Sequence, residues 1–126
     1  MNWQDVALAM AGTIGCGVAV FHGILTQRLM VRPIADIGDP RLSRPIHRLV
    51  PLLLQFSTFN WFLGGLALVA AAVGFGRDAR LATGLLVGAS YLYGALGNLW
   101  GTRGRHPGWM LMAFAVILIV LGLYRP

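Results

Sequence analysis

Four long apolar runs, separated by short polar links, organise the hydrophobic and polar positions along this chain of 126 residues. The runs cover about residues 6–30, 46–73, 81–100 and 108–124. A helix needs roughly 20 apolar residues to cross a bilayer, so four spans and short links account for the whole chain. The pattern predicts an all-α integral membrane protein, folded as a single four-transmembrane-helix bundle over residues 1–126.

Small and weakly polar residues recur at helical spacing in the first three runs, which places them on one face of each predicted helix. These stripes are Gly12, Gly15, Ala19, His22 and Thr26 in the first run, Ser57, Asn60, Gly64, Ala67, Ala71 and Gly74 in the second, and Gly84, Gly88, Tyr91, Ala95 and Asn98 in the third. Membrane helices associate through small residues, so we expect the three stripes to face one another. The fourth run is nearly uniform in hydrophobicity over residues 116–121, and we expect it to be the most lipid-exposed.

Prolines and glycines mark the first link, which extends from about residue 31 to residue 45. Pro33, Gly38 and Pro40 fall within it, and the pattern predicts an ordered, kinked loop. Pro51 fits an early turn of the second helix better than its interior, because proline has no N–H for a helical hydrogen bond.

The charges are arranged around the runs. All ten basic residues are arginine, and the four carboxylates lie at run edges or in links. Seven arginines surround the first and third links, whereas three lie on the opposite face. The first group is Arg28, Arg32, Arg41, Arg44, Arg48, Arg103 and Arg105, and the second is Arg77, Arg80 and Arg125. Because short basic links stay in the cytoplasm, both termini are predicted on the non-cytoplasmic side, in a bacterial inner membrane.

Composition excludes several classes of function. Only 11% of the residues are charged and the net charge is +6, and the arginines flank apolar runs. They therefore indicate anionic lipid headgroups as partners and argue against nucleic acid. A single cysteine, Cys16, excludes an intrachain disulfide or a paired-cysteine redox centre. No carboxylate lies within a run, which argues against a proton-coupled exporter.

The best candidate for a binding site is a group of polar residues that share one predicted membrane side. It consists of His22, Gln27, Arg28, His47, Arg48, Asn98, Arg103, Arg105 and His106. The first interpretation is structural, with hydrogen bonds between helices and side chains in the headgroup zone. The second is a pocket for an anionic headgroup or small anion, with arginines as donors. The third is a metal or haem site, in which His22 and His47 would face each other from two helices. No cofactor is otherwise predicted.

A second polar group lies deeper in the predicted bundle. It comprises Gln55, Asn60, Trp61 and Tyr91. An asparagine near the middle of a membrane either forms an interhelical hydrogen bond or belongs to a translocation path, and we favour the hydrogen bond for Asn60.

Three hypotheses for function follow. The first is a non-enzymatic binding or accessory subunit, with no catalytic residues, whose arginine and histidine face holds an anionic lipid, a small anion or a partner protein. The second is a small transporter or channel formed at a homo-oligomer interface or with a partner membrane protein. The third is a redox protein that binds haem or a metal.

Overall fold

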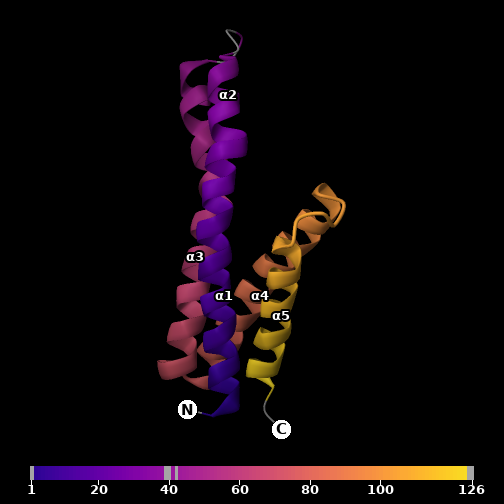
Figure 1. The fold of residues 1–126 in the computed structure, drawn as a ribbon. Helices are drawn as coiled ribbons and strands as arrows, with labels where there is room; N and C mark the ends of the chain where they lie inside the picture. Colours follow the sequence, from indigo (N-terminus) through magenta and orange to yellow (C-terminus); the bar gives the residue numbers. More distant parts are fainter. Residues whose placement is uncertain (1, 39–40, 42, 125–126) are drawn as a thin grey trace.

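The computed structural model describes residues 2–38, 41 and 43–124 and is dominated by helices (Figure 1). Its elements are α1 (Trp3–Thr26), the π-helical turn η1 (Gln27–Val31), α2 (Arg32–Ile37), α3 (Arg44–Gly74), α4 (Arg77–Gly101) and α5 (Gly108–Leu123). The predicted all-α class is confirmed over the described residues. Two helical segments, Trp3–Ile37 and Arg44–Gly74, are long and apolar enough to cross a membrane by length and composition. The apolar helix α5 is shorter, at 16 residues.

The helices form two antiparallel pairs that diverge from each other (Figure 1). One pair is long and contains α3 beside the continuous segment α1–η1–α2. The other is the shorter α4–α5 hairpin, which leans away from α1 and α3 toward the turn between α4 and α5. We call the end where α1 begins and α5 ends the narrow end, and the end that holds the α4–α5 turn the wide end. The long pair extends well beyond the hairpin at the wide end.

Glycines set the close approach of α1 and α3. A Cβ atom at Gly12 would meet the carbonyl oxygen of Gly65, and a Cβ at Gly65 would meet Cys16 and the carbonyl of Gly12. The buried face of α3 therefore includes Trp61, Gly65 and Leu68. Gly64 of the predicted stripe lies toward α4, against Val87 and Tyr91, and Tyr91 also lies against Gly15 of α1. The three stripes therefore meet here as expected, although α3 contacts Gly12 through Gly65, which the predicted stripe does not include.

The helix α5 is not the most exposed helix of the bundle, which corrects the expectation from its uniform sequence. It lies between α1 and α4 and buries Met112, Ala115, Ile119 and Gly122. Gly122 packs directly on Leu8 of α1. An evenly apolar helix carries no hydrophobic periodicity, so the small residues Ala115 and Gly122 determine which face packs.

The first link is helical over residues 31–37 and again from residue 44, whereas the sequence predicts a loop over residues 31–45, of which 39, 40 and 42 lie outside the described residues. The chain passes through η1 into α2 without a break in the helical backbone, and the π-helical turn directly before Pro33 accommodates the missing N–H of this proline. The helix ends at Gly38, which has a left-handed φ of 50°. The helix α3 begins at Arg44, so Pro51 lies inside this helix and not in its first turns as predicted.

Candidate functional site

His22 is the centre of the polar contacts between α1 and α3. Its Nε2 atom lies 3.1 Å from the Ser57 hydroxyl and 3.3 Å from the Thr26 hydroxyl. Its ring lies 4.7 Å, centroid to centroid, from the ring of Trp61, which is buried. Both hydroxyls and the indole ring of Trp61 are neutral partners, so this arrangement orients the imidazole without placing a charge beside it.

A cleft of about 690 Å³ opens between α3 and α4 beside His22. We call it the α3–α4 cleft. Its lining is mostly apolar and includes Met30, Phe56, Ser57, Asn60, Trp61, Ser90, Tyr93, Gly94, Gly97, Asn98, Gly101 and Thr102 in addition to His22. A Cβ atom at Gly97 or Gly101 would meet no other atom within 4 Å, so these glycines leave the cleft open. The Asn60 amide donates to the Ser90 hydroxyl at 2.8 Å and ties α3 to α4 within this cleft.

The turn between α4 and α5 forms the rim of this cleft at the wide end. The Gly104 N–H donates to the Leu99 carbonyl and the Arg103 N–H to the Trp100 carbonyl, the two bonds of a Schellman cap. Arg103 therefore occupies the left-handed position, with φ of 50°, where glycine is usual. Arg103 and Arg105 are exposed, next to Thr102 of the cleft lining. We call residues 102–107 the basic turn.

Side-chain hydrogen bonds hold the basic turn in place. The Thr102 hydroxyl donates to the Asn98 carbonyl at 2.6 Å, and the Trp109 indole N–H donates to the Gly104 carbonyl at 3.3 Å. His106 accepts the Gly108 N–H on Nδ1 at 3.1 Å, and its ring stacks on Phe21 of α1. The turn is thus connected to both pairs of helices, so its two arginines are carried on an ordered support.

The structure brings together some of the residues that the sequence singles out. A common pocket, described below, is lined by His22, Trp61, Asn98 and His106. Arg103 and Arg105 lie between Asn98 and His106 in the sequence. Gln55 donates to the Gly23 carbonyl and to the Gln27 side chain, and Tyr91 is fully buried and donates to the Trp61 carbonyl.

Other predicted site residues lie elsewhere. His47 lines a small pocket with Ile34 and Val50, near the end of the long pair. It is ten residues before Ser57, the partner of His22, and thus about 15 Å away along the axis of α3. Arg28 and Arg48 are exposed on the same long pair. Within the part of the chain that the structure describes, no group of three or more histidine, cysteine, aspartate or glutamate side chains is placed to hold a metal ion.

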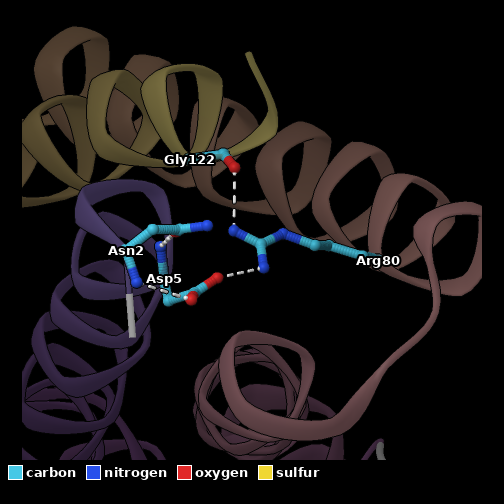
Figure 2. Close-up of polar contacts among 4 residues, drawn as sticks. All are labelled: Asn2, Asp5, Arg80 and Gly122. Carbon is cyan, nitrogen blue, oxygen red and sulfur yellow. Dashed lines mark hydrogen bonds and ion pairs between the residues drawn. The ribbon is translucent and has the colours of Figure 1, made fainter. Parts of the chain in front are cut away.

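A partly buried ion pair at the narrow end is the main feature that the sequence did not reveal. Arg80 of α4 is 6% exposed and pairs with Asp5 of α1, while its second terminal nitrogen donates to the Gly122 carbonyl of α5 at 3.0 Å (Figure 2). Asp5 also caps α1 reciprocally with Asn2. Asp5 precedes the predicted span 6–30. Hydrogen bonds from the Arg80 guanidinium and from the Asn2 backbone N–H keep the pKa of its carboxyl below the usual value.

One signal in the sequence could have indicated this pair. Asp5 and Arg80 both lie at the edge of a run on the same predicted membrane side, where a charge pair between two helix starts is sterically possible. The pair joins residues 75 positions apart, so neither run alone contains it. It ties three helices together at the narrow end, opposite the α3–α4 cleft.

No family model, curated protein or solved structure matches this chain.

Proposed function

We propose that this protein is a non-enzymatic, multi-pass protein of a bacterial inner membrane that binds an anionic phospholipid in the α3–α4 cleft. The observation that carries the proposal is the position of the basic turn. It begins at Thr102, which lines this mostly apolar cleft together with Asn98, and it carries the exposed Arg103 and Arg105 directly after Thr102 along the chain. An acyl chain matches the walls of the cleft, and a phosphate matches its rim.

Membrane insertion is supported by composition and by the length of the helices. The segment Trp3–Ile37 and the helix Arg44–Gly74 are each longer and more apolar than a span requires. The arginines also indicate how the protein is oriented in the membrane, since seven of the ten belong to the wide end. Arg80 at the narrow end is paired with Asp5, which further lowers the free positive charge there. In this proposal the wide end faces the cytoplasm and both termini lie outside.

The size and lining of the cleft support a lipid ligand. A volume of about 690 Å³ falls in the range of about 300–1,000 Å³ that is typical of small-molecule sites. Aromatic side chains such as Phe56 and Tyr93 line it and are exposed, and Gly97 and Gly101 add no side chain that would fill it. The lining that the structure describes contains no arginine, and the nearest arginines along the chain are those of the basic turn, where a headgroup would lie.

The backbone of Arg103 supports the same assignment. A non-glycine residue in the left-handed region is unfavourable by roughly 1 kcal/mol, and glycine would fit this cap without that cost. An arginine at this position is therefore consistent with a function for its side chain, and strain of this kind is often found at binding sites.

The test is retention of lipid by the purified protein, measured by native mass spectrometry from mild detergent. Phosphatidylglycerol and phosphatidylcholine are supplied at equal concentration. We expect the protein to retain phosphatidylglycerol preferentially. The double variant Arg103→Gln/Arg105→Gln should lose about 1 kcal/mol for each arginine, which weakens retention roughly thirtyfold in total. Phosphatidylcholine retention should change little.

Two matched variants distinguish this site from general attraction to charge. Arg77→Gln removes an exposed arginine at the narrow end and should leave phosphatidylglycerol retention unchanged. Gly97→Leu adds a side chain where there is open space in the cleft and should reduce retention of both lipids. Equal losses for Arg77→Gln and for the double variant would contradict the proposal.

A further inference from the structure

We propose a second binding site, for one neutral six-membered ring that carries a hydroxyl or carbonyl group, such as a phenol or the head of a quinone. The site is a pocket between α1, α3 and the α4–α5 hairpin, which we call the ring pocket. It shares His22, Trp61 and Asn98 with the α3–α4 cleft, but it is a separate volume and the rest of its lining is different. The inference does not depend on the proposed lipid site.

The size of the ring pocket selects a small ligand. Its volume is about 130 Å³. An apolar cavity of about 150 Å³, engineered in another protein, admits benzene, so a single ring is the largest rigid group that this pocket holds without rearrangement. A Cβ atom at Gly17 would meet nothing within 4 Å, which leaves space at the edge of the pocket on α1.

The walls of the pocket favour a flat ring. Phe21 and His106 stack with their ring centroids 6.4 Å apart, and His22 and Trp61 meet at 4.7 Å. All four rings line the pocket, and Val18 and Leu111 add aliphatic surface. Aromatic rings pack well against one another in offset or edge-to-face arrangements, so a planar ligand gains more contact here than a branched aliphatic one.

The polar atoms of the pocket define what the ring must carry. Because His106 accepts the Gly108 N–H on Nδ1, its neutral ring holds its proton on Nε2 and is a hydrogen-bond donor. The amide nitrogen of Asn98 donates to the Gly94 carbonyl, so its Oδ1 is an acceptor. One donor and one acceptor match a hydroxyl, and the donor alone matches a carbonyl.

The charge of the ligand follows from the lining. Among the described residues, no arginine, aspartate or glutamate lines the ring pocket, its only titratable side chains are His22 and His106, and its surface is mostly apolar. With both imidazoles neutral, an ion placed there would lose its hydration without gaining a partner of opposite charge, which is strongly unfavourable. The ligand is therefore neutral, in contrast to the anionic ligand of the basic rim.

The experiment uses 4-fluorophenol as the probe and follows its ¹⁹F NMR signal during titration with the purified protein in detergent micelles. We expect saturable binding. Gly17→Phe, which adds a ring at the pocket edge, should weaken this binding at least tenfold. His106→Asn should also weaken it severalfold, since asparagine Oδ1 can still accept the Gly108 N–H while the Nε2 donor and the ring are lost.

Three controls make the outcome decisive. Gly97→Leu lies in the α3–α4 cleft and not in the ring pocket, so it should leave binding of 4-fluorophenol unchanged even if it abolishes lipid retention. The anionic probe 4-fluorobenzoate should not bind. Circular dichroism verifies that each variant is helical. The inference is overturned if folded Gly17→Phe and His106→Asn both bind 4-fluorophenol as the unaltered protein does, or if the signal only follows detergent concentration. Failure here with normal lipid retention would leave the proposed function intact.

Discussion

Arg103 has a backbone conformation that residues other than glycine rarely adopt. It occupies the left-handed position of the cap that ends α4, where a Cβ atom is unfavourable. We expect Arg103→Gly to raise the free energy of unfolding by about 1 kcal/mol. Chemical denaturation followed by tryptophan fluorescence measures this change. The reciprocal variant Gly104→Ala, at φ of 74°, should lower stability by a similar amount. A destabilised Arg103→Gly would mean that the arginine side chain itself holds the turn.

The ion pair of Arg80 and Asp5 gives a second prediction for single residues. Arg80→Leu leaves the Asp5 carboxylate without its main partner, so it should destabilise the protein far more than Arg77→Gln does. Adding Asp5→Asn should recover part of the loss, since asparagine can still cap α1 and carries no charge. Thermal unfolding of the single and double variants measures this coupling, and purely additive effects would argue against the pair.

The same pair predicts the direction of a pH effect. The pKa of Asp5 is lowered in the folded protein, chiefly by its hydrogen bond from Arg80, so the folded state favours the carboxylate. The resulting stabilisation is complete above the usual aspartate pKa of about 3.9 and is lost as the pH falls through the lowered value. Unfolding of the unaltered protein should therefore become easier in this acidic range. The Asp5→Asn/Arg80→Leu variant should lack this part of the pH dependence.

At the scale of elements, the close contact of α1 and α3 depends on two glycines. A methyl group at Gly12 would meet the backbone of Gly65, and backbone yields less readily than a side chain. We expect Gly12→Ala to lower stability by about 1–3 kcal/mol. Gly17→Ala lies on the same helix with open space around it, and should raise stability by up to about 1 kcal/mol. Denaturation midpoints of the two variants that shift in the same direction would contradict this packing.

The sequence predicts the helices better than it predicts their connections and their packing. Four apolar runs predict four helices, because the length and polarity of a run are local properties. The continuation of α1 through η1 and Pro33 was not predicted, because a π-helical turn that accommodates a proline has no simple composition signature. The packing of α5 was also missed, since a uniformly apolar helix gives no indication of its buried face.

For the candidate site, the sequence predicts the residue types better than their grouping. His22, Asn98 and His106 were selected for their polarity and their common side, and the structure places them around one pocket. His47 was selected for the same reason but lies farther along α3. Separation along a helix axis can be calculated from residue number, whereas the divergence of the α4–α5 hairpin depends on contacts between distant residues. The cleft that follows from this divergence was therefore not predictable.

The divergence of the two helix pairs connects charge, shape and orientation for the whole molecule. The narrow end is closed by the Asp5–Arg80 pair, and the wide end is open and carries seven of the ten arginines. If the wide end faces the cytoplasm, the basic turn and the protruding part of the long helix pair meet the anionic lipid surface together. This orientation also gives the cleft access to the inner leaflet.

Reporter fusions in a bacterial host test this orientation directly. Alkaline phosphatase is active only outside the cytoplasm, and green fluorescent protein exported by the general secretion pathway does not fluoresce. Fusion after residue 126 or after Gly76 should give high phosphatase activity and little fluorescence, whereas fusion after residue 41 or Gly104 should give the opposite. The charge bias also predicts a response to mutation, because replacing arginines at positions 28, 32, 44 and 48 by glutamine should produce a mixture of orientations. A uniform cytoplasmic location of the C-terminal reporter would reverse the assignment of both ends, and would place the basic rim of the cleft outside.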